Sequence, residues 1–365
     1  MTETAVDTSA PGRRAGGSLD TAMFAALDLG TNNCRLLIAT PHARGFRIVD
    51  AFSRIVRLGE GASRSGRLGD AAMERAMGAL RVCADRIHRR GVTRVRAVAT
   101  QACRVAANGP DFVEAVAAVT GLKLEIIGAE EEAQLAVAGC LDLLDPGSRV
   151  ALVLDVGGGS TELSWIDLAA PGLKIAPRQM AHWRLPIKAW FSTPLGVVTL
   201  AERFPEAGVG DAAAYRRMVE AVKASLVQFT GADAFRPIFD AGDAHIVGTS
   251  GAITSLASLH LRLPRYDRAQ VDGLWMTRAE CEAVTTRLAS LTLAERAAEP
   301  CIGPDRADLV LAGAAILQAV QELWPTERVR VADRGLREGL LLSMMSSQRR
   351  GRSHRRRDGR GGPPE

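Results

Sequence analysis

The feature that most constrains the fold of this chain is a short pattern: an apolar strand, an acidic residue, and a turn rich in glycine and hydroxyl side chains. One copy, VALVLDVGGGSTELSW, covers Val150–Trp165. Its first residues are apolar, rich in β-branched side chains and too few for a helix, so they predict a buried strand that ends at Asp155. The segment TELSWI after the glycines predicts a second strand, and the whole pattern therefore predicts a hairpin.

The turn of this hairpin has the composition of a phosphate and metal site. Glycines permit positive φ angles and let amide groups approach phosphate oxygens, while hydroxyl side chains add donors. Two nearby carboxylates can face one Mg²⁺ ion or one water molecule, and hard cations prefer oxygen ligands. An isolated glycine triplet more often marks a plain hairpin. The candidate phosphate-binding residues are Gly157, Gly158, Gly159, Ser160 and Thr161, and the candidate metal ligands are Asp155 and Glu162.

A second copy of the pattern, FAALDLGTNNCRLLI, covers Phe24–Ile38 and supplies Asp28 as its acid. Its candidate phosphate-binding residues are Gly30, Thr31, Asn32 and Asn33. Two such hairpins indicate two related half-domains whose phosphate loops face each other across a cleft. The arrangement resembles the actin-like fold that actin, sugar and acetate kinases and chaperone ATPases share, which implies two ribonuclease H-like domains. A dinucleotide-binding fingerprint is excluded, because it needs a glycine where Glu162 stands and a helix after it.

The remaining sequence alternates predicted strands and helices, which indicates an α/β protein. Apolar residues at helical spacing predict a helix over 70–90 with Asp70 as its N-cap. A strand over 94–99 is expected to lead into a loop that carries Arg104. A loop arginine is usually a surface cation, although beside a phosphate site it would form a bidentate anion clamp.

Three acids, Glu130, Glu131 and Glu132, open a predicted helix that runs to Leu144. Acids are common in a first helical turn because the helix dipole favours negative charge there, yet one of the three would also suit a base that deprotonates water in the cleft. A strand over 245–248 is followed by GTSGAITSLASL, whose helix N-terminus is a further candidate for anion contact.

The chain has 365 residues, of which 47% are hydrophobic and 24% charged, as in a soluble protein with two domains. We expect a flexible leader at 1–20, a first domain at 21–140, a second domain at 141–347 and a disordered tail at 348–365. Residues 349–365 contain seven arginines and two acids, which accounts for the whole net charge of +5. The neutral body argues against a nucleic-acid-binding face, although the tail would suit RNA, polyphosphate or lipid if it is not simply solvated.

The six cysteines form no CxxC pair and no metal-ligand cluster with the histidines, which is typical of buried thiols in a reducing compartment. The leader lacks the apolar core of a signal peptide, and no segment has the roughly 18 to 20 apolar residues of a membrane span. These observations predict a soluble cytoplasmic protein without membrane contact.

Several segments together resemble one family. In order along about 24–345 they are DLGTNNCRLLI, RLGEGASRSGRL, ATQACRVAANG, EIIGAEEEAQLA, LVLDVGGGSTELS, TPLGVVTLAERF, VGTSGAITSLA, ADLVLAGAAIL and VADRGLREGLL. They resemble the exopolyphosphatase and guanosine pentaphosphate phosphohydrolase (Ppx/GppA) family, in a short two-domain form.

The resemblance implies an actin-like two-domain fold and Mg²⁺-dependent hydrolysis of terminal phosphoryl groups from inorganic polyphosphate, guanosine pentaphosphate or both. It implies that Glu132 is the catalytic carboxylate that activates the attacking water, and that Asp155 and Glu162 are essential acids around the metal and the water. The two loops correspond to the family's phosphate cradles, and Arg104 to an arginine that helps hold the end of the substrate. Homodimers are common in the family, so a homodimer is expected.

Departures from the family pattern bear on substrate preference. Gln134 replaces an arginine, which weakens the expectation of a salt bridge or substrate contact at that position. Residues 179–191 have no clear counterpart. The chain also ends soon after the actin-like body, without the additional helical domains of longer members. This length favours short polyphosphate or the guanosine nucleotide over processive hydrolysis of long chains.

Three classes of function are compatible with these residues. A phosphoanhydride hydrolase is favoured, because a water-activating glutamate and two phosphate loops need no second acceptor. An actin-like kinase would instead transfer phosphate to a sugar or a carboxylic acid. A non-catalytic sensor of nucleotide or polyphosphate would bind its ligand and change its domain angle without turnover, and the full set of acids makes it the least favoured class.

Overall fold

The computed structural model describes residues 22–42, 45–170, 185–206 and 212–358. The predicted leader at 1–20 lies outside the described residues, as do the first residues of the 179–191 segment that lacks a counterpart in the family.

The first sheet contains five strands in the order β3-β2-β1-β4-β5. β1 and β2 form the predicted hairpin, β3 continues it in antiparallel fashion, and β4 and β5 run parallel to β1. The strands are β1 Phe24–Leu29, β2 Asn33–His42, β3 Gly45–Ile55, β4 Arg94–Ala99 and β5 Leu124–Ile126. The helices along this part of the chain are α1 Ala62–Ser65, α2 Asp70–Arg89, α3 Gln101–Val105, α4 Gly109–Thr120 and α5 Ala129–Cys140.

The second sheet, in the order β8-β7-β6-β9-β11-β10, repeats this arrangement. β6 and β7 form the second hairpin, β8 continues it, β9 is parallel to β6 and β11 to β9, and β10 adds an antiparallel edge. The strands are β6 Val150–Val156, β7 Thr161–Asp167, β8 Ile187–Thr193, β9 Ala244–Thr249, β10 Trp275–Thr277 and β11 Arg328–Ala332. The helices are α6 Val197–Arg203, α7 Ala212–Leu226, α8 Arg236–Asp240, α9 Gly251–His260, α10 Arg268–Val271, α11 Arg278–Ser290, α12 Leu293–Ala298, α13 Val310–Leu323 and α14 Leu336–Asp358. The predicted duplication is therefore confirmed.

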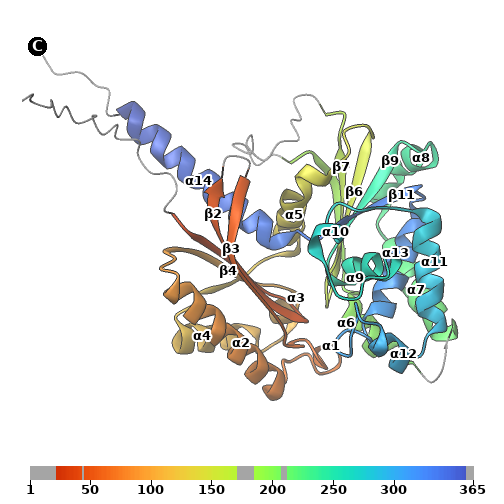
Figure 1. The fold of residues 1–365 in the computed structure, drawn as a ribbon, viewed down its shortest axis with the longest axis horizontal. Helices are drawn as coiled ribbons and strands as arrows, with labels where there is room; N and C mark the ends of the chain where they lie inside the picture. Colours follow the sequence, from red (N-terminus) through yellow and green to blue (C-terminus); the bar gives the residue numbers. More distant parts are fainter. Residues whose placement is uncertain (1–21, 43–44, 171–184, 207–211, 359–365) are drawn as a thin grey trace, which may run out of the picture.

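The two domains lie side by side, with α5 and α14 at one end of their junction and α1 and α6 at the other (Figure 1). The chain crosses between the domains after α5 and again between β11 and α14. α5 contacts both cores, because Leu135 packs with Phe24 of the first sheet and Val137 packs with Ala151 of the second. This α/β architecture of two duplicated domains is the predicted actin-like fold.

The last helix, α14, packs on the first domain. Leu336, Leu340 and Leu341 are buried in one cluster with Phe24 and Leu37 of the first sheet. Alternate residues of β1 face opposite sides of the sheet, and α14 covers the side that α2 and α4 leave free. The prediction that 141–347 forms one domain therefore does not hold for this helix. α14 also continues to Asp358, so it extends past residue 348, where the disordered tail was predicted to begin.

Other predicted elements differ locally. Gly69, not Asp70, is the N-cap of α2, and Asp70 is its first helical residue. The segment after β4 forms the short helix α3, so Arg104 lies on a helix and not in a loop. The helix that contains Glu132 ends at Cys140, and a 3₁₀ turn at 141–143 follows it.

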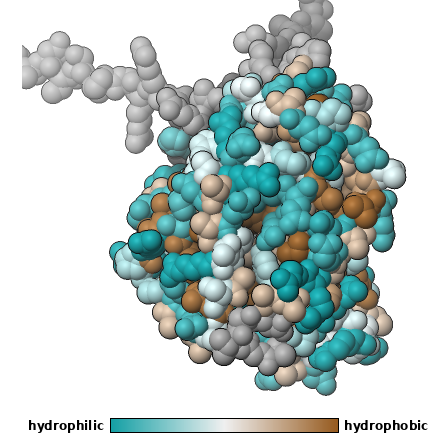
Figure 2. All heavy atoms as spheres, turned by 90° about the vertical axis from the view of Figure 1, so that its right-hand side faces the viewer, coloured by the Kyte–Doolittle hydropathy of each residue, from teal (hydrophilic) through white to brown (hydrophobic). Residues whose placement is uncertain are grey.

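The state of the cysteines and the character of the surface match what the composition predicts. The six cysteines are buried and free, as predicted. Seen from the side of the second domain, the surface is largely hydrophilic with scattered hydrophobic side chains (Figure 2), which is normal for a solvent-exposed face. Among the described residues, no helix combines the length and apolar character that a membrane crossing requires.

Candidate active site

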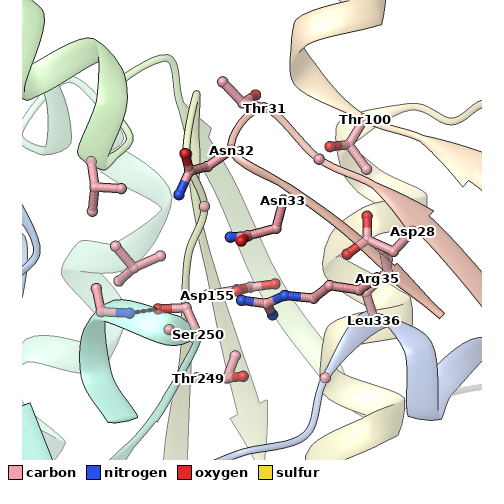
Figure 3. Close-up of a pocket in the computed structure, with 18 of the residues that line it drawn as sticks. Asp28, Thr31, Asn32, Asn33, Arg35, Thr100, Asp155, Thr249, Ser250 and Leu336 are labelled. Atoms are coloured by element: carbon pink, nitrogen blue, oxygen red, sulfur yellow. Dashed lines mark hydrogen bonds between the residues drawn. The ribbon is translucent and has the colours of Figure 1, made fainter. Parts of the chain in front are cut away.

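The ends of the two hairpins meet at a cavity between the domains. β1 and β6 each bring an acid, Asp28 and Asp155, to the wall of this cavity. The loops 30–33 and 157–160 line it as well, so the structure brings both predicted phosphate loops together. In Figure 3, Asp28 and Asn33 approach the cavity from the first domain and Asp155 approaches it from the second.

The strand register gives each acid a partner on the facing strand. Asp155 lies opposite Glu162 in the β6–β7 hairpin, and Asp28 lies opposite Arg35 in the β1–β2 hairpin. Residues in register on antiparallel strands project from the same face of the sheet. The second hairpin therefore places two acids together, as predicted, whereas the first places a cation beside its acid.

The two phosphate loops touch across the cavity. A Cβ atom on Gly158 would lie 3.0 Å from the Cβ of Thr31 and 3.1 Å from the backbone nitrogen of Asn32. Gly157, Gly158 and Gly159 have no positive φ angle, so the freedom that glycine gives to φ is not used in this loop. Gly158 is required instead because the loop of the other domain leaves no room for a side chain.

Polar atoms of the first loop are buried without partners. Thr31 and Asn32 are only 5% and 8% exposed. The Thr31 hydroxyl and the Asn32 amide oxygen have no hydrogen-bond partner among the described residues. Buried polar atoms in proteins are normally hydrogen-bonded, so these two atoms are available as contacts for a polar ligand in the cavity.

Glu132 lies in the first turn of α5 and lines the cavity, although its side chain is largely buried. Burial, and then the negative charge of Glu162, raise the pKa of Glu132 to about 8. Arg104 opposes this rise, because its Nη1 donates a hydrogen bond to Glu132 Oε2 at 3.0 Å. A carboxylate whose pKa lies near neutrality is suited to accept a proton from water.

The other acids of the site are also protonated more readily than free carboxylates. Burial, followed by the charges of Glu132 and Asp28, raises the pKa of Asp155 to about 7. Burial, followed by the charge of Asp155, raises the pKa of Glu162 to about 7, and the Ser192 hydroxyl opposes this by donating to Glu162 at 2.8 Å. Burial also raises the pKa of Asp28. The crowding of these acids makes a nearby cation favourable.

This set of carboxylates fits Mg²⁺, which prefers oxygen ligands and often uses one or two protein carboxylates, completed by water and substrate phosphates. Among the described residues, no three acidic, histidine or cysteine side chains are grouped closely enough to enclose a metal alone. Of the predicted pair, Asp155 lines the cavity and Glu162 lies behind it.

Thr161 does not belong to the phosphate loop. It is not part of the cavity wall, and its hydroxyl donates a hydrogen bond to the carbonyl of Leu195 at 2.7 Å. The structure turns the side chain of this first residue of β7 toward Leu195, so it does not bring the Thr161 hydroxyl together with the other predicted phosphate-binding residues. Ser160, one residue earlier, lines the cavity as predicted.

Arg104 does not reach the cavity wall either. Its guanidinium donates to the carboxylate of Glu132, to the side chain of Gln101 and to the carbonyl of Ile127. Three of the five N–H donors of Arg104 are therefore directed at protein groups, and the residue is not part of the cavity wall, so the structure does not place this guanidinium as the predicted phosphate clamp. Arg104 instead holds Glu132 in place and favours its charged form.

The neighbours of Glu132 on α5 have structural roles. Glu131 pairs with Arg96, and Glu130 accepts a hydrogen bond from Gln134. Gln134, which replaces the arginine of the family pattern, lies on the exposed side of the helix and does not line the cavity. This departure therefore leaves the cavity wall unchanged.

Three arginines that the sequence analysis did not single out line the cavity, namely Arg35, Arg306 and Arg337. In Figure 3 the side chain of Arg35 extends from β2 toward Asp155. A sequence signal for Arg35 existed, because alignment of the two hairpins places it where the second hairpin has Glu162. The hairpin alignment says nothing of Arg306, which precedes α13, or of Arg337, at the start of α14. Only the fold brings these two segments to the cavity.

The start of α9 also lines the cavity, through Thr249, Ser250 and Gly251. Ser250 is its N-cap, and its hydroxyl accepts a hydrogen bond from the amide of Ala252. The helix N-terminus that the sequence indicated for anion contact is therefore placed at the site, where its dipole favours negative charge.

A duplicated α/β fold with two facing phosphate loops, a buried glutamate and paired acids defines an actin-like protein that is equipped to act on a phosphorylated ligand. The profile of the Ppx/GppA phosphatase family matches residues 37–348. The chain belongs to this family, as its motifs predicted.

Known proteins resemble the chain over nearly its whole length. Exopolyphosphatase 2 of Mycobacterium tuberculosis is 30% identical over 336 residues, which cover 88% of this chain and 98% of that protein. The crystal structure of the Aquifex aeolicus Ppx/GppA family member has 27% identity and a TM-score of 0.70, covering 90% of this chain and 98% of that one. An exopolyphosphatase structure from Cytophaga hutchinsonii has 21% identity and a TM-score of 0.76, covering 89% and 98%, and shows the shared fold alone.

Proposed function

We propose that this chain is a Mg²⁺-dependent phosphohydrolase that releases terminal orthophosphate from inorganic polyphosphate, guanosine pentaphosphate or both. The observation that carries the proposal is the buried Glu132, with a pKa raised to about 8, on the wall of a cavity that two phosphate loops also line. The name of the Mycobacterium tuberculosis relative, exopolyphosphatase 2, supports a phosphoanhydride as the substrate class.

In the proposed reaction, the terminal phosphoryl group lies in the cavity that both loops border. Loop amides and the Thr31 hydroxyl donate to its oxygens, and Arg35 supplies positive charge. Glu132 accepts a proton from a water molecule whose oxygen attacks the phosphorus, and the bond to the leaving phosphate oxygen breaks. Such general-base help is typically worth ~10²- to 10⁴-fold in rate. Mg²⁺ held by Asp155 would neutralise charge on the phosphoryl oxygens, as positioning and neutralisation supply most of phosphoryl-transfer catalysis.

Arginines of the cavity wall would contact the part of a polyanionic substrate that lies beyond its terminal phosphoryl group. Arg306 and Arg337 line the same cavity as the acids, and the N-terminus of α9 adds its dipole. Both candidate substrates end in the same phosphoanhydride, so the residues around Glu132 do not rank them. The homodimer and the cytoplasmic location remain predictions.

The test is phosphate release with Mg²⁺ from short polyphosphate, long polyphosphate and guanosine pentaphosphate, comparing the native protein with Glu132→Gln. We expect release in the native protein and a fall of roughly 10²- to 10⁴-fold in the variant, with an unchanged melting temperature. Transfer of phosphate to an added sugar or carboxylic acid would indicate the kinase instead. Binding without any turnover would indicate the sensor, and either result would refute the hydrolase.

A further inference from the structure

One segment of the first domain, residues 57–63, reaches across to the second domain at the end of the junction opposite α5 and α14. Arg57 makes a two-point ion pair with Asp308, in which Nη1 donates to Oδ2 at 2.7 Å and Nη2 to Oδ1 at 3.1 Å. Glu202 of α6 accepts a hydrogen bond from the Gly61 amide at 2.8 Å and one from the Ser63 hydroxyl at 2.7 Å. Figure 1 places α1 beside α6 at this end of the molecule.

On the first domain, this segment is bonded to the first phosphate loop. The amides of Val56 and Arg57 donate to the carbonyl of Asn32 at 2.8 and 3.0 Å, and the amide of Gly59 donates to the carbonyl of Thr31 at 2.9 Å. A Cβ atom on Gly59 would lie 2.2 Å from Cγ2 of Thr31, so the Thr31 side chain packs directly on the Gly59 backbone. A movement of residues 57–63 must therefore move the loop that carries Thr31 and Asn32.

On the second domain, the partner helix is bonded to the second phosphate loop. The amides of Val197 and Val198, at the start of α6, donate to the carbonyls of Gly157 and Gly158 at 3.0 and 2.8 Å. Glu202 lies on the same helix, one turn further along. Each side of the cross-domain contact is thus attached to one of the two loops that border the cavity.

The two loops are in close contact in this structure. Since even a Cβ atom on Gly158 would lie 3.0 Å from the Cβ of Thr31, there is no room for a phosphate group to pass between the loops at this point. Entry or release along this path requires the domains to separate about the chain crossings beside α5 and α14. Such a separation would break the cross-domain contacts of Arg57 and Glu202. The side chains of the Arg57–Asp308 ion pair are 33% and 37% exposed. Partly exposed ion pairs are weak enough to break and re-form.

We propose that Arg57, Asp308 and Glu202 form a cross-cleft latch, which holds the two phosphate loops together around the substrate and releases them when the domains open. These are positioning residues, because they act through the loops and do not touch the reacting atoms. The effect on turnover rests on the proposed function, whereas the effect on domain opening does not. Arg57 also has a φ of 47°, an uncommon value for a residue other than glycine.

The experiment measures domain separation and turnover in the same variants. Spin labels are attached to cysteines introduced at the exposed positions Arg81 of α2 and Thr286 of α11, which is practicable because the six native cysteines are buried. Electron paramagnetic resonance then gives the distance between domains, and phosphate release gives kcat and KM. The variants are Arg57→Met, Glu202→Gln and their combination.

We expect each single variant to shift the distances between the two spin labels to longer values and to lower kcat/KM about 5-fold. The combined variant should lower kcat/KM about 25-fold. The melting temperature should stay unchanged in all three. Glu60→Gln is the matched control, because Glu60 lies in the same segment but pairs with Arg75 of its own domain. Its distances and kcat/KM should match the native protein. Exchange of the charges by Arg57→Asp with Asp308→Arg should restore part of the loss.

Unchanged distances in the combined variant would overturn the latch, whatever the turnover. A loss of kcat/KM with unchanged distances and no recovery on charge exchange would also overturn it, since the residues would then contact the substrate directly. If the native protein releases no phosphate, the proposed function fails, and the label distances still decide whether the latch exists.

Discussion

Substitution of Arg104 tests directly how the site sets the pKa of Glu132. In Arg104→Met the guanidinium that donates to Glu132 Oε2 at 3.0 Å is removed, while most of the aliphatic side chain remains. At that separation and an effective dielectric constant of about 20, the charge interaction is at most about 5 to 6 kcal/mol, or about 4 pKa units. Neighbouring opposite charges in proteins usually shift a carboxyl pKa by about 1 to 3 units, which is the range that we expect.

The direction of the effect follows from the charges. Burial and the charge of Glu162 raise the pKa of Glu132 and Arg104 lowers it, with a net value of about 8. Without Arg104 the pKa rises further, so less of the glutamate is ionised at pH 7 and less can accept a proton. In a plot of kcat against pH, the acid limb should move upward by about 1 to 3 pH units. At pH 7 kcat should fall roughly 10- to 1000-fold, and it should recover as the pH rises.

The assay is phosphate release across a pH series, with Arg96→Met as the matched control. Arg96 pairs with Glu131, the neighbour of Glu132 on the same helix, and with Glu125. Its loss should leave the acid limb in place. An Arg104→Met variant with a raised KM and an unmoved acid limb would refute the tuning role and restore the phosphate clamp that the sequence suggested.

Two further predictions concern stability. Folded-state pKa values of about 7 to 8 for Asp155, Glu162 and Glu132 lie above those of the unfolded chain, so these acids stabilise the fold at low pH and lose that contribution as the pH rises to about 8. Mg²⁺ should therefore raise the melting temperature more at pH 8.5 than at pH 5.5, and an equal rise at both would contradict the carboxylate site. Arg296 is fully buried, pairs with Glu206 and donates to the carbonyl of Ala307. Arg296→Met should cost about 3 to 5 kcal/mol in the free energy of unfolding, since Glu206 is left unpaired, and a loss below about 1 kcal/mol in denaturant titration would refute this.

Both hairpins were predictable from sequence because their signals are local. An apolar run, an acid and a turn lie within about sixteen consecutive residues, and the strand register then follows from the turn. Asp28 and Asp155 were therefore assigned correctly to the ends of β1 and β6. Glu132 was different, because an acid in a first helical turn is usually only a favourable dipole contact, and the resemblance to a family singled it out.

Interactions between distant residues were not predictable in the same way. The family resemblance implied that Arg104 binds phosphate, yet three of its donors bond to Glu132, Gln101 and Ile127, which the fold brings to it. Thr161 follows three glycines and a serine, but the pleat of β7 turns its hydroxyl toward Leu195. Neither outcome is encoded in the few residues around the motif.

By itself, the sequence determined the duplicated α/β fold, the family, the two candidate phosphate loops and the acids at their strand ends. These properties depend on short-range patterning of apolar, small and acidic residues. Only the tertiary structure decided which domain α14 covers, that Arg35, Arg306 and Arg337 share the cavity, and that Arg57 and Glu202 make contacts between the two domains. These depend on contacts between residues tens to hundreds of positions apart, which form only when both sheets are packed.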